Sequence, residues 1–280
     1  MSVKIIVDSS ADVTEEIRER LTFVPLTVRF GQEEFIDSVT INHKQFYEKL
    51  IESDELPTTS QASPAMFEEI FEKTVSNGDS AVVITLSSKL SGTYQSAVIA
   101  AMDFEDSVFV VDSKNVAIGS GILAELALQL VDEGKTASQI AEIITKEREN
   151  VKLIAMLDTL EYLKKGGRIS KTVAFAGGLL SIKPVATITD GEVEIIGKAR
   201  GSKQANNFLV TEIEKSGGVD FSKPLLLGYT GLSDILLQKY IEDSKTLWQD
   251  SAENLKCTAV GSIIGTHAGP GAVAVAFFKK

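Results

Sequence analysis

The fold is decided by residues 81–101, which run AVVITLSSKLSGTYQSAVIAA. An apolar run over residues 81–86 predicts a buried strand, and an alanine-rich run over residues 97–101 predicts a helix. The turn between them is rich in hydroxyl groups and contains Ser91 and Gly92. Free backbone N–H groups and the positive end of the dipole make a helix N-terminus favourable for an anion. The turn is therefore predicted to face an anionic group.

The same alternation of strand and helix continues on both sides of this stretch. Short β-branched runs at residues 3–7 and 108–111 predict strands that end in Asp-Ser. Helical patterns begin after Ser63-Pro64, span residues 118–131, and restart at Thr136, where Gln139 completes a capping box. This alternation is typical of a parallel sheet with helices on both faces, an αβα arrangement.

Ligands of such sheets bind at the carboxyl ends of the strands. Four polar residues follow predicted strands, namely Asp8, Ser9, Ser88 and Ser91. We therefore expect these side chains to lie along one rim.

The second half of the chain predicts an α+β domain with partly antiparallel strands. Asp190-Gly191 joins two strand-like runs and is a strong hairpin signal. A short helix is predicted between a cap formed by Asp158 with Glu161 and the glycines at 166–167. The change of pattern places a boundary near residue 152, which divides the chain into domains of residues 1–152 and 153–280. Residues 22–56 follow no single pattern.

The composition is that of an acidic protein. The chain has 280 residues, a formal net charge of −11 and a single cysteine, Cys257. Nucleic acid and anionic membrane surfaces require clustered Lys and Arg, so neither is an expected partner. No apolar run approaches the length of a membrane span, so stable membrane insertion is not expected either. The lone cysteine excludes an internal disulfide, which fits a cytoplasmic protein, and the apolar run at residues 3–7 is too short for a signal peptide.

No metal site is expected from the residue types. Two histidines and one cysteine are too few for a structural zinc site. The spacing of Asp8, Asp12 and Asp37 matches no known cation-binding loop. The chain also has no glycine-rich nucleotide-binding motif.

Several candidate site residues have both a functional and a purely structural interpretation. Ser91 and His267 could supply the nucleophile and base of a serine hydrolase or acyltransferase, although no third group that orients the histidine is evident. His267 lies in a Gly- and Pro-rich stretch that is predicted to be a loop, and such a loop either approaches a ligand or simply turns. His43 is expected on the surface.

Two further segments have plain interpretations. Residues 57–61, Pro-Thr-Thr-Ser-Gln, form a hydroxyl cluster whose composition alone predicts an ordinary loop. Arg168 follows a double glycine, where most arginines neutralise the carbonyl dipoles at a helix end.

Taken together, these motifs resemble the DegV family of bacterial fatty-acid-binding proteins, and the resemblance spans the whole chain. The motifs that carry it are Asp8–Asp12, Pro57–Gln61, Leu90–Tyr94, Val111–Ser113, Leu157–Ser170, Gly178–Pro184 and Gly265–Gly271. Ala62 departs from the pattern, because a proline is common there in the family.

The resemblance implies a two-domain protein that holds a long-chain fatty acid, such as palmitate, between its domains. It implies that Thr59 and Ser91 hydrogen-bond the carboxylate, that His267 lies near the head group, and that Arg168 lies near the pocket mouth. It further implies that the chain is a carrier without cofactor or catalytic activity. The bound acid would go to a separate fatty acid kinase for conversion to acyl phosphate, as a step toward phospholipid synthesis.

Arg168 and Arg200 are the residues expected to help the kinase engage, although Arg200 also fits an ordinary solvated strand end. A serine hydrolase or acyltransferase and a lipid-responsive regulatory module remain the alternatives.

Overall fold

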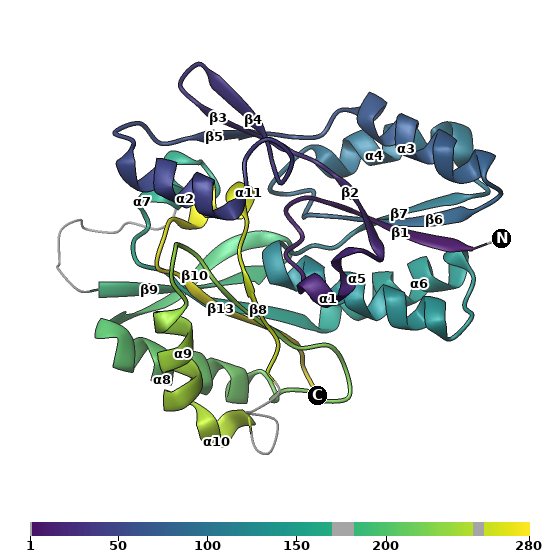
Figure 1. Ribbon diagram of the computed structural model, residues 1–280. Coiled ribbons are helices and arrows are strands. Elements are labelled where there is room, and N and C mark those ends of the chain that lie inside the picture. Colours follow the sequence, from purple (N-terminus) through teal and green to yellow (C-terminus); the bar gives the residue numbers. More distant parts are fainter. Residues whose placement is uncertain (1, 170–181, 249–254) are drawn as a thin grey trace.

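The computed structural model describes residues 2–169, 182–248 and 255–280, and contains two principal sheets with one helix between them (Figure 1). The first sheet has four parallel strands in the order β2-β1-β6-β7. Its strands are β1 (Val3–Asp8), β2 (Leu21–Val24), β6 (Ser80–Thr85) and β7 (Val108–Asp112). The predicted parallel sheet is confirmed, including the strand within residues 81–86.

Helices cover both faces of this four-stranded sheet, as predicted. The helices are α3 (Pro64–Ser76) and α4 (Thr93–Ala101), then α5 (Ala117–Asp132) and α6 (Ala137–Glu147). Figure 1 shows α3 and α4 on one side of the sheet and α5 and α6 on the other. The capping box of Thr136 and Gln139 is present at the start of α6. Two single turns of 3₁₀ helix, Met102–Phe104 and Arg148–Asn150, follow α4 and α6.

The second sheet has six strands in the order β10-β9-β8-β13-β11-β12. The strands are β8 (Val151–Met156), β9 (Ile182–Thr189), β10 (Glu192–Arg200), β11 (Leu226–Tyr229), β12 (Cys257–Ala259) and β13 (Val273–Phe278). The predicted hairpin is confirmed, because β9 and β10 pair antiparallel around Asp190-Gly191, both with positive φ. The predicted domain boundary at residue 152 falls within β8 and stays a prediction.

One face of the six-stranded sheet is covered by helices of the second half of the chain. They are α8 (Gly201–Lys215), α9 (Ile235–Asp243) and α10 (Lys245–Trp248). The other face looks toward α5, which also contacts β1 and β6 of the first sheet. Helix α5 is apolar on all sides, with 13 of its 16 residues buried, as expected for a helix packed between two sheets.

Part of the molecule differs from the sequence-based expectation. Residues 57–61 are not an ordinary loop, because Thr58–Ser60 form strand β5 of a small third sheet with β3 (Thr27–Phe30) and β4 (Glu33–Ile36). The region without an assigned pattern also contains α2 (His43–Glu52), and α1 (Glu15–Arg18) precedes it. Because β5 pairs with β3 through its backbone, the hydroxyl cluster needs no apolar run to form a strand.

Two smaller expectations are wrong. Helix α7 (Glu161–Lys165) is not capped by Asp158, which pairs instead with Lys183 of β9. His43 is not a free surface residue, because its ring is half-buried with its centroid 4.8 Å from that of Tyr47. The part of the family-like motif at residues 178–181 lies outside the described residues.

Candidate functional site

A cavity of about 240 Å³ lies between the two principal sheets. Its wall is formed by β5, the turn after β6, the start of α5, helix α11 (Ser262–Ala268), and strands β8, β9 and β13. Most of the lining side chains are Leu, Ile, Val or Ala. An apolar cavity of about 150 Å³ can already hold a benzene ring, so this one has room for a larger apolar group.

Among the polar side chains that line this cavity, three come from separate parts of the chain and were predicted to lie at a ligand head group. Thr59 comes from β5, Ser91 from the turn after β6, and His267 from α11. The Thr59 Oγ1 and His267 Nε2 atoms are 3.1 Å apart and form a hydrogen bond. The Ser91 Oγ lies 2.9 Å from the Thr93 Oγ1 in the first turn of α4. The fold therefore places hydroxyl and imidazole groups on a cavity wall that is otherwise mainly apolar.

The prediction of a loop around His267 is wrong, because His267 lies within helix α11. The helix tolerates Gly265 for a packing reason: a Cβ atom there would collide with the Tyr47 hydroxyl and the Phe46 ring. The glycine thus lets α11 lie directly against α2 and over the cavity. Spacing along the sequence does not reveal this contact, because residues 47 and 265 are far apart in the chain.

His267 is neutral at physiological pH. Burial is the main cause that lowers the pKa of its imidazole, to about 4, and the charge of Arg168 contributes in the same direction. The ring lies against Gly166, and its Nδ1 is buried without a hydrogen-bond partner in the part of the chain that is described. A neutral imidazole beside a threonine hydroxyl can donate one hydrogen bond or accept one.

Arg168 lies at the edge of the cavity. Its Nε donates to the Leu90 carbonyl at 3.2 Å and its Nη1 to the Gly166 carbonyl at 2.6 Å. Arg168 and Leu90 also border a smaller adjoining pocket that is lined by Lys89 and Glu192. The guanidinium group therefore neutralises carbonyl groups near the end of α7, and at the same time brings a positive charge next to Ser91.

The four polar residues lie at the carboxyl ends of adjacent parallel strands, as predicted, but Ser91 alone of the four lines the cavity. The Asp8 carboxylate is fully buried and accepts the Leu86 N–H at 2.7 Å, and the Ser9 hydroxyl accepts the Leu26 N–H. The Ser88 N–H donates to the Asp112 Oδ1. These hydrogen bonds hold the strand ends in place.

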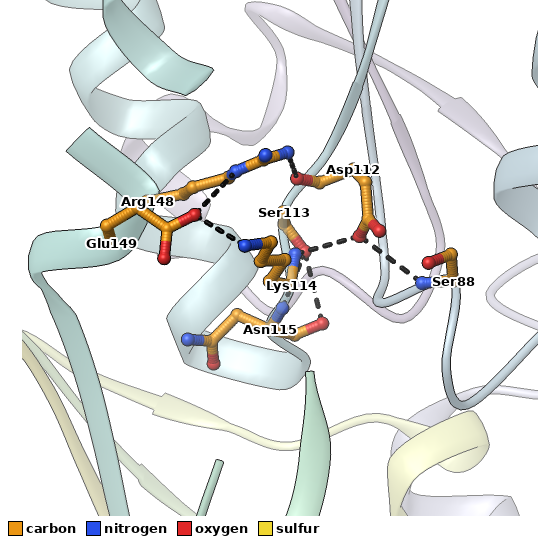
Figure 2. Close-up of polar contacts among 7 residues, drawn as sticks. All are labelled: Ser88, Asp112, Ser113, Lys114, Asn115, Arg148 and Glu149. Atoms are coloured by element: carbon orange, nitrogen blue, oxygen red, sulfur yellow. Dashed lines mark hydrogen bonds and ion pairs between the residues drawn. The ribbon is translucent and has the colours of Figure 1, made fainter. Parts of the chain in front are cut away.

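Figure 2 shows the polar contacts that hold the turn after β6 at Ser88, three residues before Ser91 in the sequence. The Asp112 Oδ1 accepts the backbone N–H groups of Ser88 at 3.2 Å and Lys114 at 2.8 Å. The Arg148 Nη1 donates to the Asp112 carbonyl at 2.7 Å, and Lys114 forms an ion pair with Glu149. The network ties the turn after β6 to the turn after β7.

Three side chains missed as site residues hold the start of α11 over the cavity. The Asp12 Oδ1 accepts the Gly261 N–H at 2.7 Å, and the Asp37 Oδ1 accepts the Ser262 hydroxyl at 2.6 Å. The Tyr47 hydroxyl donates to the Val260 carbonyl at 3.1 Å. Burial raises the pKa of both carboxyl groups. Among the described residues, no group of three or more His, Cys, Asp or Glu could hold a metal ion.

Gln61 is a further lining residue that the sequence did not single out. Its Nε2 donates to the Ser96 hydroxyl at 3.0 Å, and its amide lies so close to Gly92 that any Cβ at residue 92 would collide with it. The signal in the sequence that could have indicated such a contact was Gly92 in the turn, because a glycine allows another side chain to approach the backbone closely.

Two remaining expectations concern Arg200 and catalysis. Arg200 is the exposed last residue of β10 and does not line the cavity. Ser91 and His267 share the cavity, but each contacts a different hydroxyl group, Thr93 for the serine and Thr59 for the histidine. The structure therefore lacks the serine–histidine hydrogen bond of an activated nucleophile. No helix in the described residues is long and apolar enough to cross a membrane.

Comparison with known proteins gives matches over the full chain. The family model described as "Uncharacterised protein, DegV family" matches residues 2–280. A DegV domain-containing protein of Caldanaerobacter subterraneus is 34% identical over 283 residues, with 99% of each chain covered.

Solved structures are similar as well. A structure described as the fatty acid binding of a DegV family protein from Thermus thermophilus is 29% identical, with a TM-score of 0.89 and full coverage of both chains. The Streptococcus pneumoniae Fatty Acid Kinase (Fak) B3 protein, loaded with linoleic acid, is 26% identical, with a TM-score of 0.86 and full coverage of both chains.

Proposed function

Because this chain belongs to the DegV family, we propose that it binds one long-chain fatty acid in the cavity and presents the carboxylate to a separate fatty acid kinase. The observation that carries the proposal is the composition of the cavity wall, which is mainly apolar and includes the polar side chains of Thr59, Ser91 and His267. The similar structures, a fatty-acid-binding DegV family protein of T. thermophilus and the Fatty Acid Kinase (Fak) B3 protein of S. pneumoniae loaded with linoleic acid, support the fatty-acid-binding part of the proposal.

The aliphatic tail would supply most of the affinity. A sixteen-carbon acid buries about fourteen methylene groups, which contribute roughly 0.8 kcal/mol each, or on the order of 11 kcal/mol before the costs of binding. A hydrogen bond to a charged group contributes only about 1.5–3 kcal/mol net. The hydroxyl groups then decide the orientation of the ligand, because a carboxylate left unpaired in the cavity would be costly.

The head group would be held by Ser91 and Thr59, and His267 would hydrogen-bond the Thr59 hydroxyl. If the neutral imidazole donates its Nε2–H to the Thr59 Oγ1, the threonine hydroxyl is free to donate to a carboxylate. A bound carboxylate would also favour protonation of His267, because an opposite charge stabilises the imidazolium form. We expect uptake of a proton on binding below neutral pH.

Transfer of the phosphoryl group would be the work of the kinase, with this chain acting as a carrier without a cofactor or catalytic role of its own. Arg168, at the cavity edge beside Leu90, would then meet the head group or the kinase. Arg200, exposed at the end of β10, would contribute to docking the kinase.

Head-group anchoring is tested by comparing a fatty acid with the matched fatty alcohol. We expect Ser91→Ala and Thr59→Ala each to weaken binding of palmitic acid by roughly tenfold or more, and to change binding of hexadecanol much less. Isothermal titration of both ligands with all three proteins gives the difference. Equal losses for the acid and the alcohol would contradict the assigned role, and catalytic turnover of an activated acyl ester would favour the hydrolase instead.

Presentation to the kinase is tested at equal lipid loading. Wild type, Arg168→Ala and Arg200→Ala would be saturated with palmitic acid, and acyl phosphate formation would be measured with a fatty acid kinase. Slower turnover with unchanged lipid content is expected for Arg168→Ala. Turnover equal to that of the wild type in both variants would remove the two arginines from the proposal.

A further inference from the structure

Three alanines face one another across neighbouring strands in the cavity wall. Ala274 of β13 pairs with Ala155 of β8, and Ala155 pairs with Ala186 of β9. All three line the cavity. Because the strands are about 4.8 Å apart, the row of alanines crosses roughly 10 Å of the sheet.

Larger side chains border this row at two of the three strands. Residues two positions along a strand point to the same face, and these are Leu153 on β8, Leu157 directly after β8, and Ile188 on β9. All three also line the cavity. The small residues between them leave a trough across β8 and β9, and it is wider at β13, where the residues two positions from Ala274 are Ala272 and Ala276.

The small size of these residues is specific to this face. On the opposite face, the neighbours Ile154, Val185 and Val275 are large and buried in the cluster that contains Leu209 of α8. At the alanine row, the three strands therefore carry bulky residues on the face that a helix covers and small residues on the face of the cavity.

We propose that the alanine row, centred on Ala155, is the floor on which the acyl chain lies, and that its small side chains determine the longest chain that the protein accepts. This inference rests on the proposed function. Interiors are close-packed, so a carbon atom added to the floor must displace about one carbon atom of the ligand. Leucine at residue 155 adds three carbon atoms and should shorten the accepted chain by about three carbons.

The test is a profile of affinity against chain length, from octanoic to stearic acid, for wild type and Ala155→Leu. Each buried methylene is worth about a fourfold change, so the variant should lose roughly 50-fold in affinity for palmitic and stearic acids. Its affinity for octanoic and decanoic acids should stay within about twofold. Ala199→Leu is the matched control, because Ala199 of β10 is buried in the cluster on the other face.

The outcomes separate the two proposals. If the wild type binds none of the acids, the proposed function itself fails. If the wild type binds but Ala155→Leu shows equal losses at every length, or none, the alanine row does not determine length. Should Ala155→Leu fail to fold, Ala186→Val adds two carbon atoms at the next strand and must show a smaller loss confined to the longest acids.

Discussion

The two faces of the six-stranded sheet are built from the same strands, yet they differ in how they fill space. Toward α8 the buried Val185, Val275 and Leu209 form a continuous core. Toward α5 and α11 the alternate positions hold Ala155 and Ala186, and a cavity remains. The difference shows that the empty space is encoded in one row of small side chains that crosses the strands, and does not result from poor packing of the sheet.

The largest expected effect is a difference in the free energy of unfolding between substitutions on the two faces, measured in the ligand-free protein. Leu209→Ala should lower the free energy of unfolding by about 3–4 kcal/mol, because it opens a new void in a packed core. Leu157→Ala, on the cavity wall, should cost roughly 2 kcal/mol less, since its side chain already borders empty space. Urea unfolding of both variants gives the comparison, and equal losses would mean that the cavity is filled in solution.

The polar end of the cavity should make stability depend on pH. His267 has a pKa of about 4 in the folded protein, below its ordinary value of about 6.5, so the unfolded chain binds the proton first. Stability from this group is complete above about pH 6.5 and falls by on the order of 3 kcal/mol as the pH drops to 4.

His267→Gln provides the control for that slope. The buried aspartates have raised pKa values and act in the opposite direction, so the quantity to measure is wild type minus His267→Gln at each pH. The difference should shrink as the pH falls through this range. A difference that is flat with pH would place the imidazole in contact with water.

A bound fatty acid should stabilise the protein by an amount that depends on residues of the cavity face and not on residues of the opposite face. Palmitic acid at about a hundred times its Kd should raise the free energy of unfolding by about 2.7 kcal/mol. For a chain of this length the corresponding rise in Tm is roughly 5–10 °C. Leu209→Ala should keep the same increment and Ala155→Leu should lose most of it, as differential scanning calorimetry can show. An increment abolished by Leu209→Ala would contradict the division between the two faces.

The smallest effect concerns the carboxylates that hold α11. Asp12→Asn keeps the oxygen that accepts the Gly261 N–H and removes a charge that burial disfavours. Because the pKa of Asp12 is raised, the folded protein keeps this proton to a higher pH than the unfolded chain does. The stability that protonated Asp12 contributes is therefore lost as the pH rises above about 4. We expect the variant to match or exceed wild type by about 1 kcal/mol at pH 7, with a smaller gain at pH 5. A large loss at both pH values would show that the charge itself is required.

Local pattern was enough to predict the elements whose signals are local. The strand at residues 81–86, the hairpin at Asp190-Gly191 and the capping box at Thr136 all follow from adjacent residues, and all are confirmed. Strand β5 was missed because its stability comes from pairing with β3, about thirty residues earlier in the chain.

The site was predictable only in part, because polar residues at similar places in the sequence make different contacts in the folded protein. Asp8 and Ser91 both follow a buried strand, but Asp8 accepts hydrogen bonds inside the protein while Ser91 lines the cavity. The contact between Thr59 and His267 joins residues 208 positions apart. The alanine row depends on strand register, which becomes visible only when three strands are placed side by side.

The most direct test is native mass spectrometry of the purified protein after incubation with an excess of palmitic acid, followed by analysis of an organic extract. A mass increased by a single fatty acid, which the solvent releases as the free acid, is the expected result. A protein that keeps its unliganded mass, and whose extract contains no more acid than a blank, would show that no acyl chain is held between the two sheets.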